Sequence, residues 1–449
     1  MNRAFDFHHI SILGAGGAGM NGIAQVLMDD GADVTGYDLE ANAATKYLVE
    51  RGAEVIIGSQ EDAKLPSKCD LLLVSSAAKA DHSLIMDAKK RGVPVWTRHD
   101  LFAYWSETRE IIAITGTHGK TTTTAMAAHI LRESGSSAGY LVGIHGKGAG
   151  RSGDGKTMII EADEYAKTFL SLRPKLLVIG NMDYDHVDIY PTRESYEATF
   201  RQFIRGTQAG GGRTLVNGNS AGSQQLSNVA DGTFGGNNAD VSVKDITTES
   251  DGIRFTVVES GAEHEVFVPV WGRHNVENTV AAMIAARGAG VTLQESIKAL
   301  KTFQMPYRRQ NIFGESGGIL YVEDYAHLPE ELTASIVSAR EHNPDRRIVA
   351  VFQPHTASRL EAMMGGFSKT LELAHKAYIV NIYGTKGIRA GSGKYTSQDL
   401  ADLVPSGVAS GSVDETITRL QKELQVGDIV LSMNAGDAVK IAKTLYNNA

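Results

Sequence analysis

The chain has 449 residues, of which 42% are hydrophobic and 21% are charged. At roughly 150 residues per domain, this length predicts two to four domains with sizeable cores. The net charge of −8 argues against nucleic-acid binding, which needs clustered Lys and Arg side chains. The single cysteine, Cys69, excludes a disulfide within the chain and fits a reducing compartment.

The first residues, Met1 to Asp6, lack the apolar core of a signal peptide. No stretch approaches the ~18 consecutive apolar residues of a membrane span. We therefore expect a cytoplasmic protein that does not cross a membrane.

The N-terminal region alternates short apolar runs with glycine turns and helical patterns. His9 to Leu13 predicts a strand, Gly14 to Gly19 a turn, and Met20 to Met28 a helix. Polar Ser106 to Arg109 is typical of a linker. Further strands are expected at Asp33–Tyr37, Glu54–Ile57, Leu71–Ser75 and Val93–Trp96. This alternation predicts a parallel sheet with helices on both faces, and hence a Rossmann-like domain over residues 1–108.

Two further α/β units are expected, a central ATPase domain of P-loop type at 109–304 and a C-terminal Rossmann-like domain at 305–449. The central unit begins with the strand Ile111–Thr115 and includes an antiparallel excursion from about Arg213 to Val270. Its other elements are strands at Met158–Glu161 and Leu176–Gly180 and a helix at Asn275–Ala289. Strands of the third unit are expected at Ile319–Val322, Ile348–Phe352, Ala377–Val380 and Ile429–Ser432. The predicted fold is therefore three consecutive α/β domains.

A glycine-rich loop with a lysine lies between the strand that ends at Thr115 and a predicted helix. Glycines let the backbone approach a phosphate, and the helix N-terminus offers unpaired N–H groups to it. Lys120 is suited to the β- and γ-phosphates, and Thr121 to Mg²⁺. Ile114 stands where the usual P-loop has a glycine, so a purely structural turn is the alternative. The predicted nucleotide site comprises Gly116, Thr117, His118, Gly119, Lys120, Thr121 and Thr122.

The segment Gly14-x-Gly16-x-x-Gly19, followed by Asp38, matches the dinucleotide-binding pattern. Its helix N-terminus can hold the pyrophosphate of NAD(P) or of a UDP-sugar, and Asp38 can accept hydrogen bonds from hydroxyl groups. An NAD(P) dehydrogenase would leave the second phosphate loop without a role, which favours the UDP-type ligand. A structural glycine turn is a third possibility. The candidate substrate-binding residues are Gly14, Gly16, Gly17, Gly19, Met20, Asp38 and Ser75.

Acidic and imidazole side chains follow two strands of the central unit. We expect Glu161 and His186 to meet Thr121 at one Mg²⁺ ion, because hard oxygen ligands suit this cation. The alternative for His186 is an ordinary loop residue. Asn275 offers a donor and an acceptor to an adenine edge, although helix capping is the simpler role.

The third unit carries polar side chains after two of its predicted strands. Asp324 and His327 follow one strand, and His355 and Arg359 follow another, so we expect them at one sheet edge. Arg359 is apt for a carboxylate or phosphoryl group, because a guanidinium binds two oxygens at once. Arg308, at the start of this unit, is a candidate nucleotide-binding residue. A surface salt bridge is the alternative for each arginine.

Taken together, these motifs resemble those of the Mur ligase family, which builds the bacterial cell-wall precursor. The family patterns G-T-x-G-K-[ST], E-A-D-E, N-x-x-x-D-H and G-x-H-N-x-x-N match Gly116–Thr121, Glu161–Glu164, Asn181–His186 and Gly272–Asn278. The resemblance implies an ATP-dependent amide ligase that uses ATP and Mg²⁺ and forms an acyl phosphate. It implies catalytic roles for Lys120, His186, Asp324, His327, His355 and Arg359.

Within the family, Gly14–Met20 is similar to members that act directly on UDP-N-acetylmuramate. One such type adds L-alanine, and a recycling type adds a murein tripeptide. Phe352–His355 resembles the first type, which implies UDP-N-acetylmuramate and L-alanine as partners. Leu328 stands where the family usually has His, and Thr356 where alanine-adding members usually have Arg. The identity of the amine therefore stays open, and a nucleotide-binding protein without catalysis is a further alternative.

Overall fold

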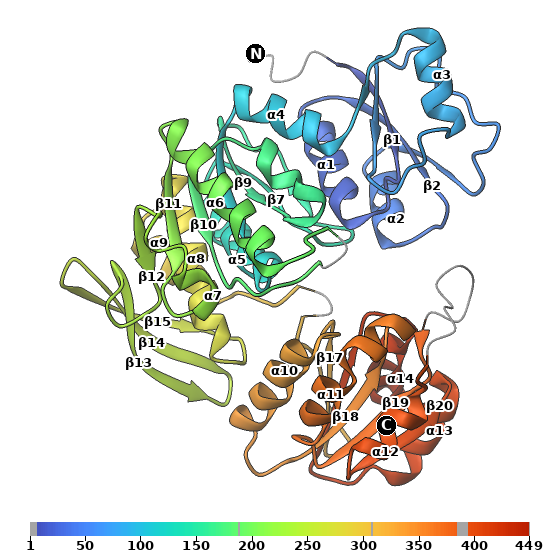
Figure 1. Ribbon diagram of the computed structural model, residues 1–449, viewed down its shortest axis with the longest axis vertical. Helices are drawn as coiled ribbons and strands as arrows, with labels where there is room; N and C mark the ends of the chain where they lie inside the picture. The colour runs from blue at the N-terminus through green and yellow to red at the C-terminus, as the bar shows by residue number, and fades with distance from the viewer. Residues whose placement is uncertain (1–6, 187–188, 307–308, 384–393, 449) are drawn as a thin grey trace. The chain divides into compact units, whose positions relative to one another are not determined.

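The computed structural model describes residues 7–186, 189–306, 309–383 and 394–448, and it contains three sheets flanked by helices (Figure 1). This architecture confirms the predicted three-domain α/β fold. By compactness, the chain divides into two units. The first unit holds the first sheet and most of the second. The second unit holds the third sheet together with residues 246–254 and 267–276, which carry parts of three strands of the second sheet.

The first sheet is parallel throughout, with strand order β3-β2-β1-β4-β5. Its strands are β1 His9–Leu13, β2 Asp33–Asp38, β3 Glu54–Ile57, β4 Leu71–Val74 and β5 Val95–Trp96, and its helices are α1 Ala18–Asp29, α2 Ala43–Glu50, α3 Ser83–Arg91 and α4 Arg98–Thr108. The expected linker at Ser106–Arg109 is wrong, because Ser106 to Thr108 complete α4. This helix is held by the buried side chains of Leu101, Phe102 and Trp105.

The second sheet has ten strands within the described residues, in the order β15-β14-β13-β12-β11-β10-β6-β9-β7-β8. Its strands are β6 Glu110–Thr115, β7 Gly139–Leu141, β8 Gly150–Arg151, β9 Thr157–Glu161, β10 Pro174–Ile179, β11 Arg213–Asn217, β12 Gly232–Phe234, β13 Val241–Glu249, β14 Gly252–Glu259 and β15 Ala262–Val268. The antiparallel excursion was predicted to begin at Arg213, but β11 pairs parallel with β10, and β12 parallel with β11. Each of these two strands extends the parallel sheet because a helix precedes it and returns the chain.

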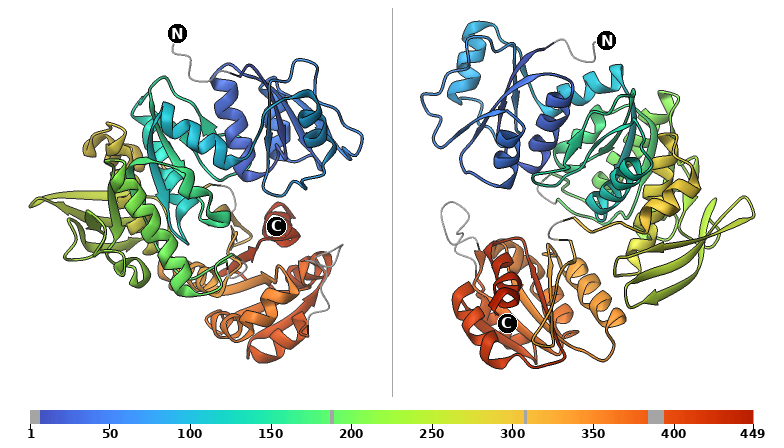
Figure 2. Two further views of the ribbon diagram at one scale, coloured as in Figure 1. Left: turned by 45° about the horizontal axis from the view of Figure 1, so that its top comes forward. Right: turned by 180° about the vertical axis from the view of Figure 1, so that it is seen from behind.

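Helices cover both faces of the parallel part of this sheet (Figure 2). They are α5 Lys120–Glu133, α6 Arg193–Ala209, α7 Ala221–Gln224, α8 His274–Gly288 and α9 Leu293–Leu300. The core beneath them is formed by apolar side chains of β6, β9 and β10, such as Ile111, Ile160 and Ile179. These residues form short apolar runs in the sequence because both faces of a covered parallel sheet are buried.

The third sheet has the order β16-β17-β21-β18-β19-β20 and is parallel except for β16. Its strands are β16 Asn311–Ser316, β17 Ile319–Asp324, β18 Arg347–Gln353, β19 Lys376–Val380, β20 Gly407–Gly411 and β21 Asp428–Asn434. Its helices are α10 Pro329–His342, α11 Ala357–Leu371, α12 Ser397–Leu403, α13 Val413–Glu423 and α14 Lys440–Asn448. None of the described helices has the length and apolar character required to cross a membrane.

Candidate functional site

The lysine-containing loop follows β6 and leads into α5 within the first unit. Gly116 and Gly119 have φ angles of 141° and 80°, which favour glycine. A Cβ on Gly116 would lie 2.6 Å from the carbonyl oxygen of Asn181, and one on Gly119 would lie 2.3 Å from Oδ1 of Asn278. No side chain caps α5, and Gly119 is its N-cap residue. The helix therefore begins with backbone N–H groups suited to an anion.

The ammonium group of Lys120 is hydrogen-bonded to the backbone of this loop. It donates to the carbonyl oxygens of Gly116 at 2.6 Å and Thr117 at 3.0 Å, and to Oε1 of Glu164 at 2.9 Å. Burial disfavours the charged amine, but the carboxylates of Glu164, Asp163 and Glu161 together outweigh it and raise the pKa of Lys120. Lys120 therefore carries a positive charge at the mouth of the loop. Glu164, which belongs to the Glu161–Glu164 motif, was not singled out from the sequence.

Thr121 and Glu161 meet as predicted for a metal site. The Thr121 hydroxyl donates to Oε1 of Glu161 at 2.8 Å, and the backbone N–H of Gly143 donates to Oε2 at 2.6 Å. Burial raises the pKa of Glu161, while these two hydrogen bonds oppose the rise. A buried carboxylate of this kind is stabilised by a cation, so the donor set fits Mg²⁺. No three His, Cys, Asp or Glu side chains in the described ranges gather as a metal cluster.

His186 lies beside Glu164. Its Nε2 is 3.5 Å from Oε1 of Glu164 and 3.8 Å from Oδ2 of Asp185. Burial lowers the pKa of His186, but Glu164 and Asp185 outweigh this effect and raise it. The structure therefore joins His186 to Lys120 through Glu164, whereas Thr121 pairs with Glu161.

The other loop residues connect to the segment after β10. The Thr117 hydroxyl donates to the carbonyl oxygen of Asp183 at 2.6 Å and lies 2.7 Å from the Tyr196 hydroxyl. Nε2 of His118 lies 3.8 Å from Oδ2 of Asp183. Thr122 is buried in the first turn of α5. These contacts fix the loop to the end of the neighbouring strand.

The second glycine loop lies at the carboxyl edge of the first sheet. Its Gly16 N–H donates to Oδ2 of Asp38 at 2.8 Å, and Gly17 is the N-cap residue of α1 without a side-chain cap. Gly14 packs closely on Ser75, since a Cβ on Gly14 would lie 2.9 Å from Cβ of Ser75. The structure thus gathers Gly14, Gly16, Gly17, Asp38 and Ser75. Met20 is buried in the core under α1, so its side chain packs behind the loop.

Arg98 lies between Gly19 of the second glycine loop and Asp163, and it was missed from the sequence. A Cβ on Gly19 would lie 2.6 Å from Nη1 of Arg98, while Nη2 lies 3.8 Å from Oδ2 of Asp163. Asp163 belongs to the same motif as Glu161 and Glu164. A guanidinium beside Gly19 can contact an anion bound at the start of α1. No local pattern marks Arg98, because it is simply the first residue of α4.

Two predicted nucleotide contacts have different outcomes. Nδ2 of Asn275 donates to the carbonyl oxygen of Trp271 at 2.7 Å, and the side chain is buried. Asn275 is the second residue of α8 and its side chain donates to this carbonyl group, so the bond is not the helix cap offered as the alternative, and the adenine contact stays a prediction. Arg308 lies outside the described residues. Asn278, which packs against Gly119 and accepts from the Thr123 hydroxyl at 3.3 Å, was missed.

The second unit brings four predicted residues to the carboxyl ends of β17 and β18. Asp324 accepts from the Ser335 hydroxyl at 2.7 Å, and burial raises its pKa despite this bond. The rings of His327 and His355 have centroids 6.5 Å apart. Burial lowers the pKa of His327, opposed by the Glu331 carboxylate. Arg359 lies in the first turn of α11.

The two departures from the family pattern have structural roles in this unit. The Thr356 hydroxyl accepts from the Arg359 N–H at 3.2 Å and so caps α11. Leu328 is buried and precedes α10 as its N-cap residue. Thr356 therefore stabilises the start of α11, whereas the Leu328 side chain makes no capping hydrogen bond to α10.

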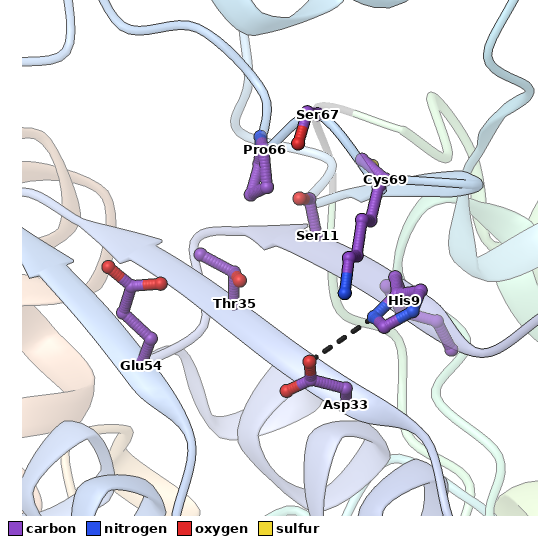
Figure 3. Close-up of a pocket in the computed structure, with 10 residues that line it drawn as sticks. His9, Ser11, Asp33, Thr35, Glu54, Pro66, Ser67 and Cys69 are labelled. Atoms are coloured by element: carbon purple, nitrogen blue, oxygen red, sulfur yellow. Dashed lines mark hydrogen bonds and ion pairs between the residues drawn. The ribbon is translucent and has the colours of Figure 1, made fainter.

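A small pocket of about 170 Å³ lies elsewhere on the first sheet (Figure 3). Figure 3 shows His9 pointing toward Asp33, and Nδ1 of His9 is 3.2 Å from Oδ2 of Asp33. Both residues begin their strands, so this pocket lies at the amino ends of the strands. Gly14 and Asp38 lie at the opposite edge, and the pocket is not part of the candidate site.

Comparisons with known families match three consecutive parts of the chain. The Mur ligase family catalytic domain matches residues 9–109, the Mur ligase middle domain residues 114–286, and the Mur ligase glutamate ligase domain residues 308–436. The UDP-N-acetylmuramate–L-alanine ligase of Roseiflexus sp. (strain RS-1) is 34% identical over 98% of both chains. The enzyme of the same description from Nitratidesulfovibrio vulgaris (strain DP4) is 35% identical over 97% of both.

Solved structures share the fold. UDP-N-acetylmuramate–alanine ligase from Thermotoga maritima superposes with a TM-score of 0.80 and 26% identity over 98% of both chains. A murein peptide ligase from Psychrobacter arcticus gives 0.68 at 24% identity over 98% of both. The latter likeness concerns the fold alone. Because full-length relatives exceed 30% identity and all three family models match in order, this chain belongs to the Mur ligase family.

Proposed function

We propose that the chain is an ATP-dependent ligase that joins UDP-N-acetylmuramate to L-alanine through an amide bond, for peptidoglycan precursor synthesis. The names of its full-length relatives support this substrate pair. The observation that carries the proposal is that one compact unit holds two glycine loops, each leading into a helix whose start has no side-chain cap. An NAD(P) dehydrogenase would use only one of these loops.

A free carboxylate is a poor acyl donor, because its leaving group would be oxide. The first step therefore activates the carboxylate by phosphorylation. The lactyl carboxylate of UDP-N-acetylmuramate attacks the γ-phosphate of ATP, which gives an acyl phosphate and ADP. Lys120 and the N–H groups at the start of α5 stabilise the charge on the transferring phosphoryl group. Glu164 keeps Lys120 charged and oriented.

Mg²⁺ is part of this proposal. Thr121 and Glu161 would hold the ion, and it would supply positive charge next to the β- and γ-phosphates. Magnesium keeps several waters and uses few protein ligands, so two side chains suffice.

In the second step the amine of L-alanine attacks the acyl phosphate, and phosphate leaves. The amine must be neutral, although its free pKa is near 8. We assign proton removal to His186, which Glu164 and Asp185 orient. We assign binding of the alanine carboxylate to Arg359 and the His327–His355 pair, at the carboxyl ends of β17 and β18. We also propose a cytoplasmic location, because the single cysteine, Cys69, is free and buried.

Phosphate release from ATP tests the proposal. The enzyme is assayed with Mg²⁺ and UDP-N-acetylmuramate, with L-alanine, glycine, L-serine or a murein tripeptide as the amine. We expect turnover with L-alanine to exceed that with every other amine. Faster turnover with the tripeptide would assign the recycling reaction, and binding of UDP-N-acetylmuramate without ADP release for any amine would indicate a non-catalytic protein.

A further inference from the structure

A second, larger pocket of about 620 Å³ lies within the first unit, and none of its lining residues belongs to either glycine loop. Its walls come from α1 and α2 on one side and from α5, β7 and β8 on the other. Four of its lining residues are basic, namely Arg51, Arg132, Lys147 and Arg151. Among the lining residues, Asp29 is the carboxylate that faces them.

This pocket lies at the C-terminal ends of α1 and α5, whereas the candidate active site lies at the N-terminal ends of these helices. The glycine loops precede the first turns of α1 and α5, whereas Asp29 ends α1 and Arg132 is in the last turn of α5. A helix of 14 residues, such as α5, is about 20 Å long. The pocket and the phosphate loop are therefore separated by about the length of this helix.

Several of the basic side chains are held in place. Nη2 of Arg51 lies 2.6 Å from Oδ1 of Asp29, and Nη1 of Arg132 donates to the Tyr140 hydroxyl at 3.3 Å. The guanidinium of Arg132 also lies over the Tyr140 ring, 5.7 Å from its centroid. Arg151 donates to the carbonyl oxygen of Ser136 at 2.5 Å. Ordered guanidinium groups lose less entropy on binding an anion than mobile ones do.

A simpler explanation accounts for only part of this cluster. Arg51 and Arg132 lie at helix C-termini, where positive charge is favourable without any ligand. Lys147 lies in a loop and Arg151 in β8, so the helix dipole does not explain them. With Asp29 subtracted, the pocket carries an excess of three positive charges, in a chain whose net charge is −8. Such a concentration of like charge is stabilised by an anion.

We propose that this pocket is a second ligand site, and that it binds an organic phosphate with at least two phosphoryl groups. The excess of three positive charges suits an organic diphosphate, and guanidinium forks suit phosphoryl oxygens. The volume falls in the roughly 300–1,000 Å³ range of small-molecule sites and exceeds the needs of a single phosphate. Tyr47 is partly exposed and offers ring surface to the organic part.

Such a ligand would connect the two parts of the first unit. It would touch α1 and α2, which follow the UDP-type loop, and α5, which follows the nucleotide loop. Helix α1 already packs on β8, because a Cβ on Gly150 would lie only 2.0 Å from the carbonyl oxygen of Gly22. Occupation of the pocket is therefore positioned to change substrate affinity from outside the active site.

Radiolabelled pyrophosphate and equilibrium dialysis on the full chain test the proposal. Pyrophosphate also binds the glycine loops, so the number of bound equivalents is compared between the wild type and a Lys147→Ala/Arg151→Ala variant. A Lys68→Ala/Lys79→Ala variant is the matched control, because both lysines lie outside the pocket and the glycine loops. Ligase rates and melting temperatures are measured on all three proteins.

We expect the pocket variant to lose one bound equivalent, or to bind it at least ten-fold more weakly, while its ligase rate stays within two-fold of wild type. The control should bind as the wild type does. A Lys147→Glu variant, which changes only an exposed side chain, should show the same loss if Arg151→Ala disturbs folding. Equal binding by the wild type and both pocket variants would overturn the proposal, as would citrate binding there as tightly as pyrophosphate.

Discussion

The ammonium group of Lys120 lies 2.8 Å from Oε2 of Glu164, a carboxylate whose side chain has no exposed surface. Removing one partner of a buried pair leaves an uncompensated charge. We expect Lys120→Met to lower the free energy of unfolding by about 3 kcal/mol, and Lys120→Met/Glu164→Gln to restore most of that loss. Urea unfolding of the two variants and the wild type measures both effects. Equal stability of the single and double variants would contradict the pairing.

The same lysine is predicted to act in phosphoryl transfer. We expect Lys120→Met/Glu164→Gln, which keeps the fold, to reduce kcat by on the order of 10²-fold or more, because a preorganised positive charge is lost. Phosphate release at saturating substrates gives the rate. A double variant that is stable and also turns over normally would remove Lys120 from the mechanism.

Gly119 is predicted to be required for the approach of a phosphate. Gly119→Ala places a methyl group 2.3 Å from Oδ1 of Asn278, at a φ of 80°. Gly135→Ala is the matched control, since Gly135 has a φ of 69° and no atom within 4 Å of its Cβ position. Both changes should cost about 1–2 kcal/mol of backbone strain. Only Gly119→Ala should abolish binding of ATP, as measured by calorimetry; equal affinities for the two variants would contradict this role.

Arg98 is predicted to position an anionic group of the substrate at the start of α1. Arg98→Ala should raise the KM for UDP-N-acetylmuramate by about ten-fold or more, because a charge-assisted hydrogen bond contributes roughly 1.5–3 kcal/mol. Arg98→Lys should recover part of this loss. Arg213→Ala, at the amino end of β11, is the control. An unchanged KM for Arg98→Ala would show that the guanidinium only pairs with Asp163.

The second unit is predicted to contain a pH-sensitive contact at His342. Its Nδ1 lies 2.8 Å from the carbonyl oxygen of Glu249, and its Nε2 accepts from the Gly272 N–H at 3.3 Å. The imidazole also stacks on Trp271, with 5.4 Å between ring centroids. Only a neutral imidazole can make both hydrogen bonds. Burial lowers the pKa of His342, despite the bond to Glu249.

Because the pKa of His342 is lower in the folded than in the unfolded state, the unfolded chain binds more protons. The stability from this contact is therefore complete above pH ~6.5 and is lost as the pH falls below that value. We expect Trp271 fluorescence to report this change, and His342→Gln to flatten the pH dependence of unfolding. The exposed His99→Gln serves as the control. Parallel pH curves for wild type and His342→Gln would contradict the prediction.

Much of the fold follows from local pattern. Strands such as His9–Leu13 and Ile348–Phe352 are short apolar runs, because helices bury both faces of these parallel sheets. The candidate site follows from topology, since the carboxyl ends of parallel strands meet at one edge. Glu161 and His186 were expected to converge on one metal with Thr121 for this reason; Thr121 does contact Glu161, whereas His186 lies beside Glu164.

What the sequence did not predict depends on distant segments. Nothing in the turn before α4 indicates that Arg98 reaches Gly19, and the pairing of Glu164 with Lys120 spans 44 residues. Asn278 and Gly119 lie far apart in the sequence of the central region, yet the Asn278 side chain packs directly against Gly119 in the loop. The polar residues at Ser106–Thr108 suggested a linker because the exposed side of α4 is polar, while Trp105 is buried on the other side.

The central claim is that the loop from Gly116 to Thr121 passes the γ-phosphate of ATP to a carboxyl oxygen. UDP-N-acetylmuramate labelled with ¹⁸O in its lactyl carboxyl group tests this claim in a reaction with ATP and L-alanine. The account predicts that each released phosphate carries one ¹⁸O atom from that carboxyl group, and that the amide product keeps the other. Unlabelled phosphate accompanying amide formation would contradict the acyl-phosphate route and the role given to Lys120.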